Sequence, residues 1–581
     1  MKKSLELSIE SLASSLTDIV GASGVELSDE SRKYHSDAML PTWQECKVIV
    51  HPGDAQQVSQ IVEYANQNGL KIWPFSTGRN WGYGTTQALH SGGIIVILDR
   101  MNRIIEVNEE LAYAVLEPGV TQAQLNQHLR DTGSRLWMDC TDSTPNGSVI
   151  GNAIERGVGY TPYGDHFGQL CGLEVVLPDG QQIKTGGSQA GCHTRHTHKW
   201  GVGPFVDGLF SQSNMGVVTQ AGIWLMPEPE EFNFMAVELK QEEDFPQLID
   251  DMRELALSGT IGNVHCFNPF LLLSSRIQYP FDRRGDRTHL PDKEVAALAR
   301  ENKVAPYSMV CGLYGNKLQV KASRKKVRNK LGKYCSILFA NEKQIAFIKK
   351  LTKRLAAGEK SNSISHRMTK WFTKTFVYSG PVNALELVPK VFGYHKGIPD
   401  EFIVKSAYFK RRKGRSEDVN PVRDQCGLVW LAPIVPATSE HVIRLMNAAK
   451  PVFDKNGFEF PLSIIMLNPR TLIFLMPLYY DKEDRDECQR VTKLYKEMID
   501  VCSELGYQQY RTGAMCMDNI LSNNEVHQKF VRNLKTALDP RNTLAPGKYG
   551  THLKKSKESK KTFPILTTDP AHGQSVRRLS T

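Results

Sequence analysis

The sequence lacks the features that would assign it to several large protein classes. Its 581 residues contain no run close to the ~18 consecutive apolar residues that cross a bilayer, so no membrane-spanning helix is expected. Its 11 cysteines lie singly between Cys46 and Cys516 without a C-x-x-C pair, which argues against a disulfide framework or zinc knuckle and favours a reducing cytoplasm. No G-x-G-x-x-G opens a helix and no G-x-x-x-x-G-K-[ST] occurs, so neither a Rossmann nor a P-loop nucleotide site is expected.

Neither end of the chain predicts a targeting signal. Glu6, Glu10 and Asp18 interrupt the apolar residues near the N-terminus, so residues 5–20 predict an amphipathic helix rather than a signal peptide. The net charge of +10 comes largely from short Lys/Arg runs without interleaved aromatics. Such runs are typical of solvated faces and tails, and they argue against nucleic-acid binding. The Lys- and Ser-rich residues 551–581 predict a disordered tail.

A glycine-rich turn, residues 76–84, is the most informative stretch. A strand at 46–50, a helix capped by Asp54 and a strand at 71–75 precede it, so the turn follows the carboxyl end of a strand, where α/β proteins bind ligands. Its three glycines allow left-handed backbone and close approach to a ligand. Successive N–H groups of such a turn can hold a phosphate.

The rest of the chain divides into a glycine-rich part, a glycine-poor part and a short final part in which glycine- and proline-bearing turns appear again. Two further glycine-rich regions, 146–166 and 208–218, complete the first part, with a predicted hairpin around Pro178-Asp179-Gly180. From Pro227 to about Leu505 helical and β-rich patterns alternate with few glycines, which predicts a second domain packed over the first.

Five motifs in one order carry a family resemblance: S-T-G-R-N-W-G-Y-G, G-N-A-I-E-R-G-V-G-Y-T-P-Y-G-D-H, F-S-Q-S-N-M-G-V-V-T, Y-R-T and L-A-P-G-K. Over roughly residues 40–550 the chain resembles the vanillyl-alcohol oxidase and p-cresol methylhydroxylase family of FAD-linked oxidoreductases, whose members oxidise 4-alkylphenols. The resemblance implies an α+β fold with a two-part FAD-binding domain and an inserted cap built on an antiparallel sheet with helices. The expected segments are an N-terminal helical extension (1–39), the first FAD part (40–228), the cap (229–504), the C-terminal FAD part (505–550) and the tail (551–581).

The same resemblance implies the site residues. Tyr83, Tyr510 and Arg511 match the residues that bind the phenol oxygen of the substrate, and Asp142 aligns with the family's acid beside flavin N5. The FAD pyrophosphate would be wrapped by backbone N–H groups of Thr77, Gly78, Arg79, Asn80 and Gly82. The flavin would be lined by Gly151, Asn152, Gly157 and Gly159, with Lys548 near its pyrimidine edge. The full set of expected FAD contacts is Ser76, Thr77, Gly78, Arg79, Asn80, Gly82, Tyr83, Gly147, Ser148, Gly151, Asn152, Gly157, Gly159, Tyr163, Gly164, Gly216, Val217, Val218 and Lys548.

The chemistry expected of this site is FAD-dependent oxidation at the para-benzylic carbon of a 4-alkylphenol or 4-hydroxybenzyl alcohol. A phenolate donates charge through its ring, so loss of a benzylic hydride to flavin N5 leaves a neutral quinone methide. Donors that stabilise the phenolate lower this barrier, and arginine keeps its charge at any working pH. The expected partners are a small phenolic substrate, oxygen or a cytochrome-like electron acceptor, and further copies of the chain in a homo-oligomer.

Two positions depart from the family pattern. Leu428 stands where several relatives attach FAD covalently through a histidine, and no His or Tyr lies between Tyr408 and His441. Leucine has no nucleophile, so non-covalent FAD is expected. Ile473 and Phe474 fall where relatives carry cap histidines, which predicts an altered pocket for the alkyl group.

For several of these residues a purely structural role remains an alternative to the functional one. Tyr510 and Arg511 can simply end a core strand, and Asp142 can form an Asx turn before Ser143-Thr144-Pro145. The cluster Cys192, His193, His196 and His198 contains metal-ligating side chains, but its spacing is not a standard one and a loop is expected, with no metal site.

Three other functions are compatible with parts of the pattern. The same fold could oxidise a non-phenolic alcohol, a 2-hydroxy acid or a sugar. A basic cap could dock an acidic electron-transfer partner. A non-catalytic binding protein is the third possibility, which the three intact glycine-rich regions disfavour.

Overall fold

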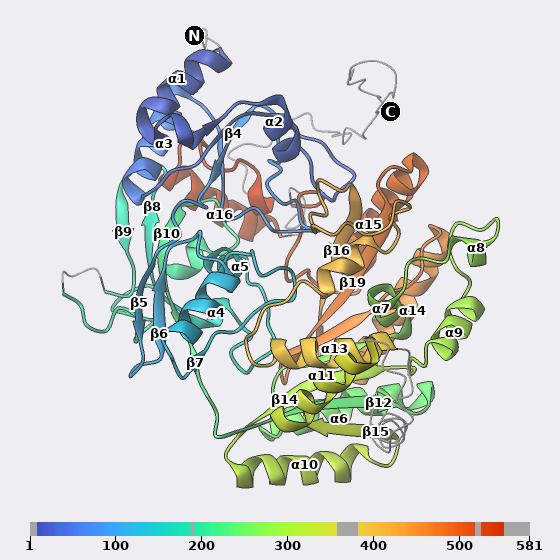
Figure 1. The fold of residues 1–581 in the computed structure, drawn as a ribbon. Coiled ribbons are helices and arrows are strands. Elements are labelled where there is room, and N and C mark those ends of the chain that lie inside the picture. The colour runs from blue at the N-terminus through green and yellow to red at the C-terminus, as the bar shows by residue number, and fades with distance from the viewer. Residues whose placement is uncertain (1–7, 188–190, 357–381, 518–523, 551–581) are drawn as a thin grey trace.

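The chain folds into two regions that face each other. The structure is a computed structural model that describes residues 8–187, 191–356, 382–517 and 524–550. The N-terminal region carries two smaller sheets, and the second region, the cap, is built on an eight-stranded sheet (Figure 1).

The first sheet contains the predicted strand–helix–strand unit. Its order is β1-β2-β4-β3, with β2, β4 and β3 parallel. The Asp54 side chain accepts from the Gln57 N–H at the start of α3, and Gly69, in left-handed backbone (φ +68°), ends the helix. The elements are α1 (Ile9–Val20), β1 (Val25–Glu26), α2 (Asp29–Ser36), β2 (Cys46–Val50), α3 (Ala55–Asn68), β3 (Ile72–Phe75) and β4 (Gly93–Ile97).

The second sheet is antiparallel, in the order β5-β6-β10-β8-β9. The predicted hairpin around Asp179 joins β8 to β9. The elements of this part are β5 (Ile104–Asn108), β6 (Tyr113–Leu116), α4 (Gln122–Asp131), β7 (Leu136–Trp137), α5 (Val149–Ile154), β8 (Leu170–Val176), β9 (Gln182–Lys184), β10 (Val217–Trp224) and β11 (Met226–Pro227), of which β7 and β11 pair separately.

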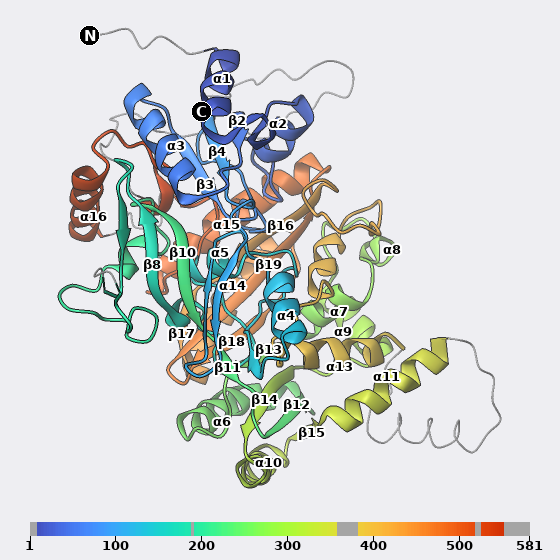
Figure 2. The same ribbon diagram turned by 60° about the vertical axis from the view of Figure 1, so that its left-hand side comes forward.

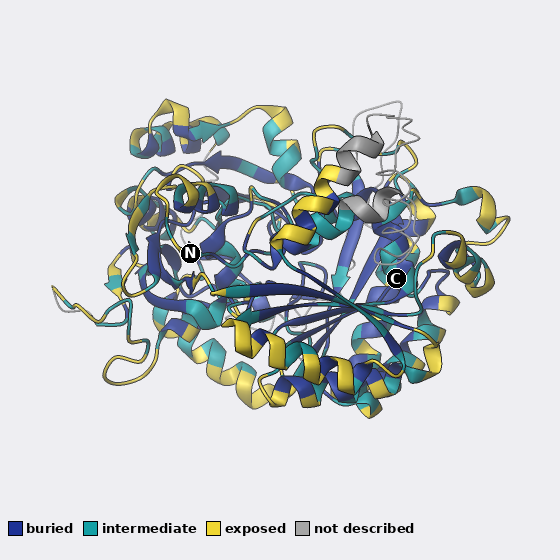
Figure 3. Ribbon diagram, turned by 60° about the horizontal axis from the view of Figure 1, so that its bottom comes forward, coloured by how far each residue is buried: buried dark blue, intermediate teal, exposed yellow. Residues whose placement is uncertain are grey.

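The cap sheet runs β15-β12-β14-β13-β18-β19-β16, and β17 pairs with β19. One face packs against α6, α10, α14 and α15 to form the largest core. Helices below the sheet in Figure 3 are exposed on their outer sides and buried towards the strands. The strands are β12 (Glu231–Leu239), β13 (Val264–Phe267), β14 (Ser308–Gly315), β15 (Cys335–Ala340), β16 (Cys426–Leu431), β17 (Ile434–Pro436), β18 (Ser463–Asn468) and β19 (Thr471–Asp481). The helices are α6 (Phe245–Leu257), α7 (Pro269–Arg276), α8 (Phe281–Arg284), α9 (Asp292–Glu301), α10 (Lys317–Leu331), α11 (Glu342–Ala356), α13 (Val382–Tyr394), α14 (Ser439–Lys455) and α15 (Arg485–Glu504).

After the cap the chain returns to the N-terminal region. Helix α16 (Glu525–Leu538) lies beside that region in both views (Figures 1 and 2). The Ile72 N–H donates to the Thr543 carbonyl (3.0 Å), and the Ala545 N–H donates to the Ile72 carbonyl (2.9 Å). The fully buried Lys535 pairs with Asp539 (2.6 Å) and donates to the Asn214 carbonyl, which fixes this return.

The N-terminal elements pack against the first sheet. Leu12, Leu16 and Val20 of α1 pack in its core, and β1 pairs with β2. The domain boundaries given above stay a prediction, and the predicted tail lies outside the described residues. Within the described ranges, no helix is both long and apolar enough to cross a bilayer.

Candidate active site

A cavity of about 450 Å³ lies between the N-terminal region and the cap. Its N-terminal wall contains the glycine turn, the segment around Gly151, the start of β10 and Lys548. Its opposite wall is the face of the cap sheet that the covering helices leave open. The cavity therefore brings together residues from three separate parts of the chain.

The glycine turn presents its backbone to the cavity. Gly78 and Gly82 have positive φ angles of +66° and +75°. The N–H groups of residues 77–80 donate to no acceptor within the described part of the chain, although the turn lines the cavity. Four successive N–H groups without protein partners suit an anionic ligand such as a pyrophosphate.

The second glycine-rich region lies directly against this turn. The Ser148 N–H donates to the Thr77 hydroxyl oxygen (3.1 Å), and a Cβ on Gly151 would lie 2.4 Å from the Ser76 hydroxyl oxygen. Only glycine permits that approach. Predicted FAD contacts that line the cavity are Ser76, Thr77, Gly78, Arg79, Asn80, Tyr83, Gly147, Ser148, Gly151, Asn152, Gly157, Gly216, Val217, Val218 and Lys548.

Tyr83, Tyr510 and Arg511 meet on the cavity, although more than 400 residues of chain separate the first from the others. The Arg511 guanidinium carbon lies 4.5 Å from the centre of the Tyr83 ring, and its Nη2 donates to Asn80 Oδ1. The Ala514 N–H donates to the Tyr83 carbonyl (3.1 Å), which holds the two segments together.

Burial and neighbouring side chains shift the pKa values of Tyr83 and Arg511. Burial raises the pKa of Tyr83 well above its ordinary value, and the contact with Tyr510 adds to that shift. Burial alone would lower the pKa of Arg511, but the neighbouring charges of Tyr510, Tyr83 and Glu155 raise it, so Arg511 stays a cation. A permanent cation beside tyrosine hydroxyls can stabilise a bound phenolate.

Asp142 also lines the cavity and is partly buried. The Tyr160 hydroxyl donates to Asp142 Oδ2 (2.6 Å). Burial raises the pKa of Asp142, and the bond from Tyr160 opposes that rise. The Tyr160 ring stacks on His265 of the cap, with ring centroids 4.0 Å apart and planes 4° from parallel. Burial lowers the pKa of His265 to about 3, so this side chain is neutral.

Lys548 pairs with a carboxylate that sequence reasoning did not single out. Its Nζ lies 2.6 Å from Glu155 Oε1, and the Tyr549 hydroxyl donates to Glu155 Oε2 (2.7 Å). Burial would raise the pKa of Glu155, but the charges of Lys548 and Arg511 hold it at about 2. The signal available in the sequence was an acidic residue inside the G-N-A-I-E-R motif.

Strand β16 of the cap closes the cavity beside the glycine turn. The Trp430 N–H donates to the Gly82 carbonyl (3.2 Å), and the Trp430 ring stacks on Tyr83 at 6.5 Å. A Cβ on Gly82 would lie 2.4 Å from Trp430 Cδ1 and 3.3 Å from Leu428 Cγ. Gly82 thus supports the cap strand and does not itself line the cavity.

Leu428 and Ile473 line the cavity, whereas Phe474 lies in the core on the opposite face of the cap sheet. Neighbouring strand residues point to opposite faces, so Ile473 and Phe474 cannot both reach the pocket.

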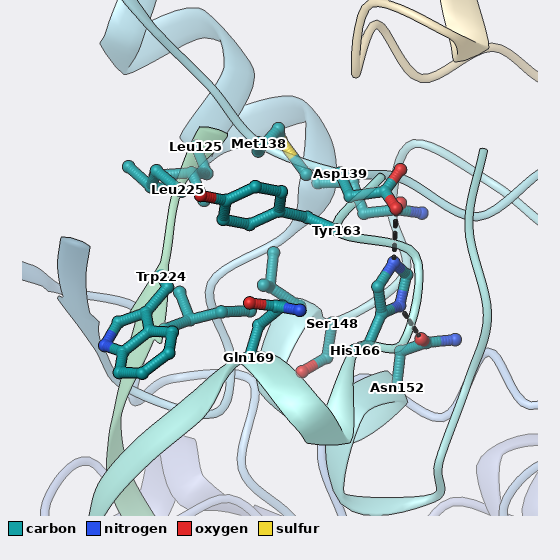
Figure 4. Close-up of a pocket in the computed structure, with 13 residues that line it drawn as sticks. Leu125, Met138, Asp139, Ser148, Asn152, Tyr163, His166, Gln169, Trp224 and Leu225 are labelled. Atoms are coloured by element: carbon teal, nitrogen blue, oxygen red, sulfur yellow. Dashed lines mark hydrogen bonds and ion pairs between the residues drawn. The ribbon is translucent and has the colours of Figure 1, made fainter. Parts of the chain in front are cut away.

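Gly159, Tyr163 and Gly164, all expected FAD contacts, do not line the large cavity. Their loop folds back on itself, with the Gly159 N–H donating to the Gly164 carbonyl (3.0 Å). Tyr163 instead lines a separate cavity of about 10 Å³, where it points towards Leu125 and Leu225 (Figure 4).

His166 lines the small cavity and contacts Asn152, a residue that also lines the large cavity. Its Nε2 lies 3.4 Å from Asp139 Oδ2, and its Nδ1 lies 2.6 Å from Asn152 Oδ1 (Figure 4). Asn152 lines both cavities, so the Asp139–His166 pair fixes the orientation of a predicted flavin contact.

In the histidine-rich loop, His196 packs against the neighbouring strands. His196 Nδ1 lies 2.9 Å from the Cys171 carbonyl, and its ring packs 5.7 Å from that of Tyr113. Among the described residues, no group of three His, Cys, Asp or Glu side chains is placed to hold a metal ion.

Comparison with known proteins agrees with this geometry. Residues 46–186 match the FAD binding domain family model, and residues 473–549 match the model of the C-terminal domain of FAD linked oxidases. The chain is 34% identical to the 1'-carboxy-chondrochloren decarboxylase of Chondromyces crocatus over 93% of this chain and 97% of that protein. It is 29% identical to the 4-cresol dehydrogenase [hydroxylating] flavoprotein subunit of Pseudomonas putida over 86% of each chain. The crystal structure of p-cresol methylhydroxylase with substrate bound superposes with a TM-score of 0.80 at 26% identity, covering 94% of this chain and 97% of that one.

The chain belongs to the p-cresol methylhydroxylase family of FAD-linked oxidoreductases. The expected α+β fold of that family, with FAD as cofactor, is confirmed. The residues present fit FAD as in other members of this family, because the N–H groups at 77–80 have no acceptor among the described residues and the turn lines the cavity together with Gly147 and Gly151.

Proposed function

We propose that this enzyme oxidises the para-benzylic carbon of a 4-alkylphenol or 4-hydroxybenzyl alcohol. The observation that carries the proposal is the convergence of Tyr83, Tyr510 and Arg511 on one cavity, with the Arg511 cation 4.5 Å from the Tyr83 ring centre. Two hydroxyls and a guanidinium form a set of donors that matches a phenolate oxygen.

These residues lower the barrier by holding the substrate as phenolate. Loss of the phenolic proton and of a benzylic hydride converts the phenol into a neutral quinone methide. Bound FAD supplies the two-electron acceptor for that hydride. Asp142, as carboxylate, accepts the proton of a water molecule that adds to the quinone methide, and Tyr160 holds its Oδ2 in place.

The test replaces Arg511 by methionine. We expect kcat/KM for a 4-alkylphenol to fall about 100- to 1,000-fold, the cost of removing one transition-state donor. Released FAD is quantified alongside, to show that the variant still binds its cofactor. The methyl ether of the same phenol, which cannot ionise, should be a poor substrate of both proteins. An Arg511→Met enzyme with wild-type turnover would rule out the proposed role.

The FAD of this enzyme is proposed to be non-covalent. Leu428 lines the cavity beside Gly82 and offers no nucleophile. Acid precipitation of the purified protein should therefore release yellow flavin into the supernatant. Flavin that stays in the pellet would contradict this proposal.

A second candidate reaction is oxidative decarboxylation, favoured by the 34% identity to a protein named as a decarboxylase. If the carbon next to the benzylic position carries a carboxylate, the quinone methide can lose carbon dioxide. The electron pair of the broken C–C bond then forms the double bond of a vinylphenol and restores the aromatic ring. Incubation with 3-(4-hydroxyphenyl)propanoate distinguishes the two candidates, since only decarboxylation yields 4-vinylphenol and carbon dioxide.

A further inference from the structure

The cap wall of the cavity has an apolar half and a polar half. Strand pairing places Ala236, Val310, His265, Ile465 and Ile473 in one row across the sheet. The next row on the same face contains Glu238, Ser308, Phe267, Ser463 and Leu475. All ten residues line the cavity.

The phenol-binding cluster lies at the apolar row. Tyr510 packs against the hydrophobic cluster that contains Ile465 and Ile473, and Leu475 of the next row packs against the same cluster. The polar row lies two residues further along the strands, about 7 Å away at the usual rise per residue. A substituent that extends from the para position of a bound phenol can therefore reach the polar row.

Arg276 lies at the end of α7 and lines this polar part of the cavity. Four Lys or Arg side chains line the cavity, and three have a hydrogen bond: Arg79 to Tyr34, Arg511 to Asn80, and Lys548 to Glu155. For the Arg276 guanidinium, no hydrogen bond or ion pair is formed with any residue in the described ranges, and its Nε is buried.

The charge of Arg276 is only partly balanced by the protein. Burial lowers the pKa of Arg276, and the charge of Glu238 opposes but does not cancel that effect. A partly buried guanidinium with unused donors is suited to a carboxylate, which it can bind through two parallel hydrogen bonds.

We propose that Arg276 and the polar row around Ser308 bind a carboxylate carried on the para side chain of the phenolic substrate. The inference rests on the proposed function, because the phenol cluster defines one end of the ligand. It identifies the substrate class as 4-hydroxyphenyl compounds with an anionic side chain, rather than simple alkylphenols.

The test uses ligands that cannot be oxidised. Acids of the form HO–C6H4–O–(CH2)n–COO⁻ have oxygen at the para position and no benzylic hydrogen, so they bind without turnover. Their dissociation constants are measured from the change in flavin absorption of the holoenzyme, with n varied and with the methyl esters and 4-butoxyphenol as neutral partners. At the best chain length the wild type should bind the acid roughly ten- to hundredfold more tightly than its ester.

Substitutions at the polar row should change this preference in opposite directions. Arg276→Gln should abolish it while leaving the affinity for 4-butoxyphenol within about twofold, and Arg276→Lys should keep part of it. Glu238→Gln should increase it, because a competing carboxylate is removed. Arg283→Gln is the matched control, since Arg283 of the neighbouring α8 pairs with Glu301 of α9 and does not line the cavity.

The outcomes separate this inference from the proposed function. Equal affinity for acid and ester at every length, or a preference that survives in Arg276→Gln, overturns the role of Arg276. If 4-ethylphenol reduces the flavin in the same preparation, the proposed function stands despite that result. If 4-ethylphenol does not reduce the flavin and 4-butoxyphenol does not bind, the proposed function fails and the inference fails with it.

Discussion

The two walls of the cavity are built in different ways. The N-terminal wall presents backbone, with N–H groups at 77–80 and glycines that allow segments to approach within contact distance. The cap wall presents side chains from alternate positions of five paired strands. The backbone wall is suited to a fixed cofactor and tolerates no added atoms, whereas the side-chain wall can change its specificity one residue at a time.

The first prediction concerns Gly82, which contacts strand β16 of the cap from within the glycine turn. An alanine there would need a left-handed backbone, which costs about 1–2 kcal/mol, and its Cβ would lie 2.4 Å from Trp430. Overpacking typically adds about 1–3 kcal/mol, so Gly82→Ala should lose about 2–5 kcal/mol of stability. The urea midpoint and the FAD content of the purified protein should both fall.

Gly133→Ala is the control for that substitution. Gly133 also has a positive φ (+68°), but a Cβ there meets no atom within 4 Å. It should lose only the backbone contribution, about 1–2 kcal/mol, and retain its FAD. Equal losses in the two variants would mean that the contact with β16 does not matter.

The second prediction concerns His265 in the cap wall. Its folded-state pKa of about 3 lies below the ordinary value of 6.5, so its contribution to stability is complete above pH 6.5 and is lost as the pH falls towards 3. At pH 4.5 this loss amounts to about 2–3 kcal/mol. Phenylalanine can keep the stacking on Tyr160 without a titrating group, so His265→Phe should lose less stability than the wild type between pH 7.5 and 4.5.

Urea denaturation at the two pH values measures this effect, with His527→Gln as the control. His527 is exposed on α16, so its replacement should leave the acid sensitivity unchanged. The same acid sensitivity in His265→Phe and wild type would show that His265 is not held neutral by burial.

The same contrast explains how far the sequence could be interpreted. The strand–helix–strand unit, its cap at Asp54 and the glycine turn are local features, so their residues could be named before the structure. Tyr83, Tyr510 and Arg511 could be paired only through the family resemblance. The cap wall depends on strand register, for example Glu238 opposite Ser308 and Phe267 opposite Ser463, which joins residues about 70 and 200 positions apart.

In the second glycine-rich region, the predicted FAD contacts include residues that line the cavity and residues that do not. Gly151, Asn152 and Gly157 line the cavity, but the chain then turns back at Gly159 and carries Tyr163 away from it. A Cβ on Gly164 would meet Asn263 Nδ2 at 1.9 Å, so this glycine is needed for packing against the cap. Glycine has the same appearance in a sequence whether a ligand or a neighbouring chain segment requires it.

The smallest predicted effect concerns the bond that connects the two walls. Tyr160 donates to Asp142 in the N-terminal wall while its ring stacks on His265 in the cap wall. Tyr160→Phe removes a donor that lowers the pKa of Asp142, so that pKa should rise further above its ordinary value. If Asp142 acts as a carboxylate, the acid limb of the kcat/KM profile should move to higher pH by about one unit, equivalent to about 1.4 kcal/mol.

The control is Tyr314→Phe, because the Tyr314 hydroxyl donates to the His395 carbonyl (2.8 Å) and has no bond to Asp142. It removes a comparable buried hydroxyl and should leave the acid limb in place. If the acid limb moves equally in both variants, general loosening of the aromatic cluster explains the shift. If it moves in neither, Asp142 does not act as a carboxylate in the rate-limiting step, and Tyr160 serves only to hold the cap against the N-terminal wall.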